Sequence, residues 1–297
     1  MYNGILNIYK EKGYTSHDVV ARLRGILQQK KIGHTGTLDP DAEGVLPVCL
    51  GRGTKLCDML TDKDKVYETE LLLGVTTDTQ DIGGSILCKK EVSVDEDTVY
   101  KIIESFIGPY AQIPPMYSAI KIHGKKLYEI ARTGQSIERE PRQVQIYDIE
   151  IVEMKLPYVH MKVHCSKGTY IRTLCHDIGE KAGCGGCMYS LKRTRVSGFT
   201  VAQSLTLDRV ETFVKEGRIE EYIIPVDRMF EKYPAYYDDG SNDKLLSNGN
   251  LFASNGKIIQ GKIRVYKNDG AFVGIYEYDS QKDSYVPVKI FYDPSGE

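Results

Sequence analysis

The sequence lacks tryptophan and any long apolar run. With no Trp among its 297 residues, aromatic stacking falls mainly to 21 Tyr and 7 Phe. No stretch approaches the roughly 18 apolar residues that a membrane-spanning helix needs. The first residues, MYNGI, also lack the basic-then-apolar layout of a signal peptide. We therefore expect a cytoplasmic protein that makes no contact with a membrane.

The chain also lacks an excess of one charge and a regular cysteine pattern. Its 39 Lys and Arg face 41 Asp and Glu, which neither demonstrates nor excludes a nucleic-acid partner, because local clustering decides. Seven cysteines without regular spacing argue against a disulfide framework. The 41% apolar content supports a folded core. The length allows one large domain with a small one, or two medium domains.

Apolar periodicity predicts a mixture of helices and strands, an α+β fold. Strands are expected over residues 4–9, 67–73, 143–154 and 158–165, and helices over 15–27, 95–107, 169–180 and 208–221. Residues 31–55 are predicted to form a long loop broken by an apolar element at 45–50, and 108–115 a second loop. Residues 121–142, with six Lys or Arg against three Glu, are predicted to be an exposed insertion.

The pattern changes after Pro225, which suggests a second structural unit. Short alternating runs at 263–267, 271–278 and 286–292 are separated by turn residues and predict a small all-β unit. We therefore divide the chain into a main domain over residues 1–230 and a β domain over residues 231–297.

Residues 33–47, GHTGTLDPDAEGVLP, form the most unusual segment. Its glycines permit positive φ angles and close backbone approach to a ligand, and Pro40 pushes Asp39 toward an extended conformation. A carboxylate on such a loop can project into a cleft as a nucleophile or a base. A surface Asp-Pro turn accounts for the same residues, so spacing alone does not decide between these readings.

This segment resembles the catalytic motif of the TruB family of pseudouridine synthases. Five further segments resemble the family's motifs in the same order along the chain, at residues 65–81, 114–121, 124–134, 165–174 and 191–199. Together they cover nearly all of residues 1–230. Each segment alone could mislead, whereas six in the right order are very specific.

The resemblance implies an enzyme that isomerises uridine to pseudouridine in the T-loop of tRNA, at position 55. The uracil is detached, rotated and rejoined through C5 after the base has flipped out of its stack. No redox change occurs, so we expect neither a cofactor nor a metal. The implied fold is a pseudouridine synthase domain with a mixed, largely antiparallel sheet flanked by helices, followed by a PUA-like, RNA-binding β barrel. A monomer without an obligatory protein partner is expected.

The resemblance also implies roles for single residues. Asp39 is the expected catalytic carboxylate, Arg172 its ion-pair partner, and Tyr67 a ring that stacks on the target base and helps to remove its C5 proton. Taken alone, Tyr67 would be packing and Arg172 a surface arginine. Whether the carboxylate attacks C1′ or abstracts a sugar proton stays open. The expected substrate-binding residues are His34, Leu191, Lys10, Lys125, Lys126 and Tyr170.

Two departures from the family pattern stand out. The first motif of the family usually reads Lys-Pro-x-Gly, and here residues 10–13 are KEKG. Residues 231–297 carry eight Lys or Arg against ten Asp or Glu, which argues against strong phosphate binding by the β domain. Basic residues are expected to contact the phosphate backbone of the RNA. Some lie in the insertion, which the resemblance places against the T-arm as a thumb, and the others are Arg22, Arg24, Lys30, Lys31, Lys192, Arg193 and Arg195.

Three alternatives compete with this interpretation. The pair Cys184 and Cys187 could belong to a zinc site, although no second Cys-x-x-Cys accompanies it. A non-catalytic RNA-binding or RNA-chaperone protein would share the basic insertion but has no need of Asp39, Tyr67 and Arg172 together. A guide-RNA-dependent synthase would share the aspartate motif but generally lacks the thumb insertion.

Overall fold

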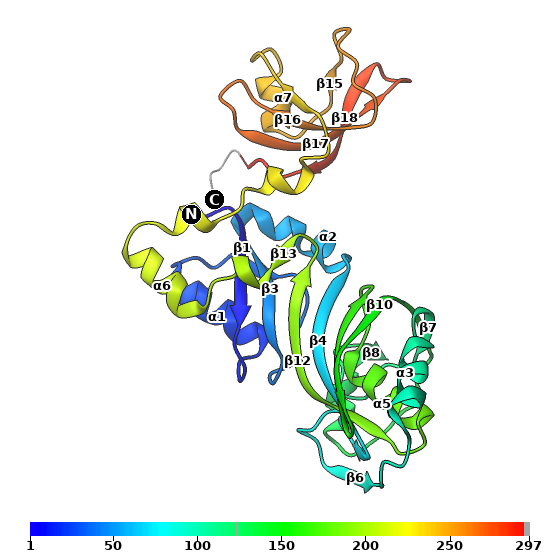
Figure 1. Cartoon of the computed structure of the whole chain (residues 1–297). Coiled ribbons are helices and arrows are strands. Elements are labelled where there is room, and N and C mark those ends of the chain that lie inside the picture. Colours follow the sequence, from blue (N-terminus) through cyan, green and yellow to red (C-terminus); the bar gives the residue numbers. More distant parts are fainter. Residues whose placement is uncertain (123, 294–297) are drawn as a thin grey trace.

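Two β-sheets organise the computed structural model, which describes residues 1–122 and 124–293 (Figure 1). Residue 123 of the predicted insertion and residues 294–297 of the predicted β domain lie outside the described residues. The larger sheet has nine strands, and its main order is β1-β3-β12-β4-β11-β10-β7, with β2 beside β3 and β13 beside β12. The strands are β1 (Gly4–Lys10), β2 (Ile32–His34), β3 (Glu43–Leu50), β4 (Lys65–Leu73), β7 (Gly108–Gln112), β10 (Arg142–Lys155), β11 (Tyr158–Cys165), β12 (Gly186–Val196) and β13 (Phe199–Thr200).

The larger sheet is mixed and largely antiparallel. Strands β3 and β12 pair in parallel, whereas the other neighbours along the sheet are antiparallel. The helices are α1 (Ser16–Ile26), α2 (Cys57–Thr61), α3 (Glu96–Glu104), α4 (Leu127–Ala131), α5 (Ile171–Lys181), α6 (Leu207–Lys215) and α7 (Asp243–Ser247), with 3-10 turns η1 (Gly51–Leu56), η2 (Val201–Gln203), η3 (Ile219–Tyr222) and η4 (Val226–Phe230). This arrangement confirms the predicted fold class. Among the described residues, no helix is long and apolar enough to cross a membrane.

The two halves of the larger sheet are buried differently, and their sequences reflect this. Helices α1 and α6 pack on one face of β1 and β3, and the opposite face of these strands contacts a second apolar cluster. Because both faces are covered, residues 45–50 form a continuous apolar run. Helices α3 and α5 cover one face of the other half, so β11 alternates between buried and more exposed residues.

The smaller sheet forms the C-terminal part of the molecule (Figure 1). Its order is β14-β16-β17-β18-β15, and the strands are β14 (Ala235–Tyr237), β15 (Phe252–Ala253), β16 (Lys262–Tyr266), β17 (Phe272–Asp279) and β18 (Ser284–Ile290). It has its own apolar core. A second cluster joins Ile5 and Val45 of the larger sheet to Ile275 and Phe291, so the two sheets share buried surface.

Several predictions about local structure need correction. Residues 108–115 were expected to be a loop, but β7 occupies 108–112 and pairs with β10. Pro109 is tolerated there because β7 is an edge strand and its missing N–H leaves no ladder bond unmade. The long loop predicted over 31–55 is shorter, because β2, β3 and η1 take up most of it. The helix predicted over 208–221 ends at Lys215, just before Gly217, which adopts a φ of 71°.

The largest omission is β12, which runs through the middle of the larger sheet between β3 and β4. Its sequence, GCMYSLKRTRV, gave no strand prediction because polar and basic residues interrupt the apolar alternation. The structure shows two register shifts in its pairing with β4, between Met188 and Ser190 and between Arg193 and Arg195. Such β-bulges break the two-residue period on which the prediction relied.

Candidate active site

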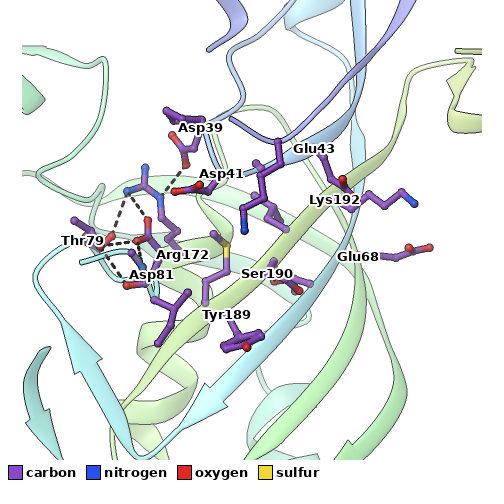
Figure 2. Close-up of a pocket in the computed structure, with 18 of the residues that line it drawn as sticks. Asp39, Asp41, Glu43, Glu68, Thr79, Asp81, Arg172, Tyr189, Ser190 and Lys192 are labelled. Carbon is purple, nitrogen blue, oxygen red and sulfur yellow. Dashed lines mark hydrogen bonds and ion pairs between the residues drawn. The ribbon is translucent and has the colours of Figure 1, made fainter. Parts of the chain in front are cut away.

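A cavity of about 750 Å³ opens where the loop before β3 meets β12 and the N-terminus of α5 (Figure 2). The loop contributes Asp39 and Asp41, and α5 contributes Arg172. Further lining residues come from β3, β4, β11, β12, the segment after β7 and the β5–β6 connection, where β5 is Val75–Thr77 and β6 is Ile86–Lys89. They include Glu43, Glu68, Thr69, Thr79, Asp81, Ile82, Tyr117, His160, Met188, Tyr189, Ser190, Leu191 and Lys192.

Asp39 and Arg172, which lie far apart in the sequence, meet in this cavity. The Arg172 Nε atom lies 3.0 Å from Asp39 Oδ2, and the dashed line in Figure 2 marks this ion pair. The Arg172 side chain is only 6% exposed, whereas 42% of the Asp39 side chain is accessible. The carboxylate is therefore anchored from behind and open toward the cavity.

Carbonyl groups and a second carboxylate fix the Arg172 guanidinium. Its Nη2 donates to the Tyr117 carbonyl at 2.9 Å, and its Nη1 donates to the Thr79 carbonyl at 3.2 Å and lies 3.7 Å from Asp81 Oδ2. Asp81 is itself held by the Thr79 hydroxyl, at 2.7 Å. This planar fork binds several acceptors at once, which a lysine cannot reproduce.

The start of α5 is held by a buried glutamine. Gln112 of β7 is 1% exposed, and its amide accepts from the Tyr170 backbone N–H at 2.8 Å and donates to the Tyr170 carbonyl at 3.0 Å. Tyr170 is the residue before the first turn of α5. The Gln112 contacts therefore position the helical turn that carries Arg172.

Two buried cations hold the loop that carries Asp39. Lys10 is fully buried, and its ammonium donates to the carbonyls of Pro40, Ala42 and Glu11. Burial lowers the pKa of Lys10 to about 8, partly opposed by the negative charge of Asp39. Lys10 was predicted to bind substrate. The structure places it under the loop, with its ammonium engaged by backbone.

Arg193 is the second buried cation, at 1% exposure. Its Nε donates to the Val45 carbonyl at 2.8 Å, and its Nη groups donate to the carbonyls of Gly36 and Thr37 at 3.2 and 3.5 Å. The prediction that Arg193 grips the RNA backbone is therefore wrong, because its donors are buried in the protein. Gly44 makes this packing possible: it has a φ of 110°, and a Cβ atom there would lie 2.2 Å from the Arg193 carbonyl oxygen.

The surroundings of Asp39 change the acidity of its carboxyl group. The surrounding protein removes water from the Asp39 carboxyl and raises its pKa above the ordinary value. The Arg172 charge opposes this rise, and Asp81 adds to it. Arg172 therefore keeps Asp39 ionised at a lower pH than burial alone would allow.

Tyr67 and Leu191 lie on neighbouring strands but differ in access to the cavity. Leu191 of β12 lines it. Tyr67 of β4 is 7% exposed and packs in the apolar core beside Leu38 and Ala42. Burial raises the pKa of Tyr67 to about 12. Its phenol is therefore protonated at neutral pH, and stacking on a base remains a prediction.

His34, Lys125 and Lys126 are not among the described residues that line the cavity. His34 ends β2, its Nδ1 accepts from the Gly36 N–H at 3.3 Å, and its ring meets that of His17 edge-on with centroids 5.4 Å apart. Lys125 and Lys126 form β9, which pairs with β8 (Lys121–Ile122). Lys125 is exposed, whereas Lys126 donates to the Tyr128 hydroxyl at 3.2 Å.

Comparison with known proteins identifies the family. The model of the TruB family pseudouridylate synthase N-terminal domain matches residues 24–171, and that of the tRNA pseudouridylate synthase B C-terminal domain matches residues 172–231. A Lachnoclostridium phytofermentans protein named tRNA pseudouridine synthase B is 54% identical over 97% of this chain and 99% of its own. A Clostridium novyi protein of the same name is 46% identical over 92% and 94%.

The chain belongs to the TruB family. Two solved structures extend the comparison to the fold. One is described as an H/ACA RNP bound to a substrate RNA containing 2'-deoxyuridine, with 26% identity, a TM-score of 0.70 and coverage of 97% of this chain and 84% of that one. The other is a Cbf5-Nop10-Gar1 complex, with 29% identity, a TM-score of 0.71 and coverage of 98% and 86%. The larger sheet thus has the pseudouridine synthase fold, and the smaller one is PUA-like.

Several residues that build the site of this TruB-family chain were not predicted from its sequence. Gln112 and the carbonyls of Thr79 and Tyr117 carry no chemical signal in a sequence, because their role depends on where the backbone folds. Asp81 and Tyr117 did fall within segments that resemble family motifs. Cys184 and Cys187, the pair considered for zinc, are both buried, and no group of three His, Cys, Asp or Glu side chains in residues 1–122 and 124–293 is placed to hold a metal ion.

Proposed function

We propose that this protein isomerises uridine to pseudouridine in the T-loop of tRNA, with Asp39 as the catalytic carboxylate. The observation that carries the proposal is the Asp39–Arg172 ion pair in an open cavity, at the positions that the family motifs predicted. The curated relatives named tRNA pseudouridine synthase B align with nearly their whole length, which favours tRNA as the substrate.

The geometry suits a flipped uridine. The cavity of about 750 Å³ lies within the range of small-molecule sites, roughly 300–1,000 Å³, and accepts a nucleotide withdrawn from its stack. Leu191 and Ile82 give apolar surface for the ring, while the Asp39 carboxylate is free on its cavity side to act at the sugar or the base. Arg172 holds the carboxylate in place and ionised.

The remaining predicted residues either position the site or contact RNA outside the cavity in this proposal. Lys10, Arg193 and Tyr170 position the Asp39 loop and the start of α5. Tyr67 lies beneath the Asp39 loop, and its protonated phenol suits hydrogen bonding or packing better than proton abstraction. His34 and Lys125 remain available to contact RNA outside the cavity, together with the exposed surface of the insertion.

We also propose a two-domain division, with residues 1–230 catalytic and residues 231–297 an auxiliary RNA-contacting unit. The enzyme is proposed to act in the cytoplasm as a monomer, without a cofactor or an obligatory protein partner. The β8–β9 hairpin and α4 form the thumb-like insertion, whose presence favours the stand-alone tRNA enzyme over a guide-RNA-dependent synthase.

The test is tritium release from a T-arm stem-loop that carries 5-tritiated uridine, with purified protein and no guide RNA. Release identifies a stand-alone synthase. Binding without release would favour the non-catalytic RNA-binding alternative. Release that requires an added guide RNA and partner proteins would favour the guide-dependent alternative.

A further inference from the structure

A β-bulge lies in the strand that forms one wall of the cavity. Met188 pairs with Leu71 and Ser190 pairs with Glu70, so Tyr189 between them is the extra, unpaired residue of β12. Bulges next to active sites re-aim side chains. Here the bulge lies within residues 188–192 of β12, all of which line the cavity.

Tyr189 is an exposed aromatic ring held in place on this wall. Its side chain is 44% exposed, and Figure 2 shows it below Ser190, on the opposite side of the site from Asp39 in this view. The ring of Tyr158, from β11, supports it edge-to-face, with centroids 5.4 Å apart and an interplanar angle of 81°. A ring that is supported on one side and open on the other offers a free face for stacking.

The carboxylates that line the cavity favour a base over a phosphate at Tyr189. Glu68 of β4 lines the same cavity opposite Lys192 of β12, and its carboxylate opposes a phosphate group in the cavity. Lys192 and Lys12 line the cavity as well, and their ammonium groups suit the backbone of a strand that enters it. An aromatic face, by contrast, accepts any nucleobase, because every base has a π face.

We propose that Tyr189 and Tyr158 form a second nucleobase subsite, which stacks an unpaired base of the RNA strand adjacent to the reacting uridine. The inference rests on the proposed function, because flipping one nucleotide out of a loop leaves its neighbours without their stacking partner. A base on Tyr189 offsets part of that loss and sets the direction in which the strand crosses the cavity.

The test compares Tyr189→Ala and Tyr189→Phe with wild type, using the 5-tritiated T-arm stem-loop. Tyr189→Ala is expected to raise KM about tenfold with kcat little changed, because stacking is worth roughly 1–3 kcal/mol per base and acts before and during the reaction. Tyr189→Phe keeps the ring and is expected to retain the wild-type KM. Tyr147→Ala, which removes a ring of 48% exposure on β10 that does not line this cavity, is the matched control.

A direct binding readout separates this inference from the proposed function. Stem-loops with 2-aminopurine on the 5′ or the 3′ side of the target are titrated with each protein, and stacking on Tyr189 is expected to quench one of them. Tyr189→Ala should lose that quenching while Tyr189→Phe keeps it. Equal quenching by wild type and Tyr189→Ala, or equal KM values, would overturn the subsite. Failure of wild type to release tritium would instead refute the proposed function, and the quenching experiment would still decide on the subsite.

Discussion

Replacing Arg172 with methionine should damage both the fold around the site and the acidity of Asp39. The guanidinium is 6% exposed, and it donates to the carbonyls of Thr79 and Tyr117 besides pairing with Asp39. Hydrogen bonds to charged groups contribute about 1.5–3 kcal/mol each, and water from the cavity would replace part of what is lost. We therefore expect the free energy of unfolding to fall by about 3 kcal/mol.

The same substitution has a predictable effect on the pH dependence of catalysis. Burial raises the pKa of Asp39, and the Arg172 charge opposes that rise, so its removal raises the pKa further. The reactive form is the anion, so activity is lost as pH falls through this pKa. As pH is lowered, tritium release by Arg172→Met should therefore begin to fall at a higher pH than release by wild type. Its kcat should also be lower at every pH, because Asp39 is no longer held in place.

Chemical unfolding and tritium release across the acid pH range measure both effects. Arg218→Met is the control, since this surface arginine is 48% exposed, forms ion pairs with the exposed Glu216 and Glu221, and lies over the Phe213 ring, which a methionine can still cover. Its loss should cost well under 1 kcal/mol. This account of Arg172 would be refuted if Arg172→Met had the kcat of wild type, or if its activity fell at the same acid pH as that of wild type.

Two further predictions concern the loop that carries Asp39. Arg193→Lys leaves three buried carbonyls without the guanidinium fork, so urea unfolding should show a loss of about 3 kcal/mol and tritium release should slow although the charge is kept. An unchanged kcat would show that Arg193 does not position the loop. Gly44→Ala places a Cβ 2.2 Å from the Arg193 carbonyl oxygen at a φ of 110°, and should cost more than 3 kcal/mol. Gly198→Ala, whose Cβ meets nothing within 4 Å, should leave stability nearly unchanged; equal stability of the two variants would contradict the packing argument.

The sequence predicted the elements whose pattern is local. Helix α1 begins where the helix over residues 15–27 was predicted, and Thr15 and Asp18 exchange hydrogen bonds between side chain and backbone at its start. Strand β11 follows its apolar alternation, and β16, β17 and β18 form where alternating runs were found. Strand β12 was not predicted because its bulges and basic residues interrupt the two-residue alternation of apolar side chains. One of these basic residues, Arg193, is buried and donates to three backbone carbonyls.

The candidate site shows a similar division. Motif resemblance predicted that Asp39 and Arg172 pair, and the two side chains are in contact in the structure, although they lie far apart in the sequence and no local pattern connects them. It could not reveal that Lys10 and Arg193 are buried under the loop, because lysine and arginine are usually exposed. Nor could it identify Gln112, whose function depends on two contacts with the backbone of Tyr170.

The central claim is that the Asp39 carboxylate performs the chemistry, and single-turnover tritium release by Asp39→Asn tests it most directly. The substitution keeps the shape of the side chain and removes its charge, so RNA binding should persist while the rate falls at least about 1,000-fold, or roughly 4 kcal/mol. Asp41→Asn, a neighbouring exposed carboxylate that lines the same cavity, should retain activity within about tenfold of wild type. Release by Asp39→Asn at a rate near that of wild type would contradict the account.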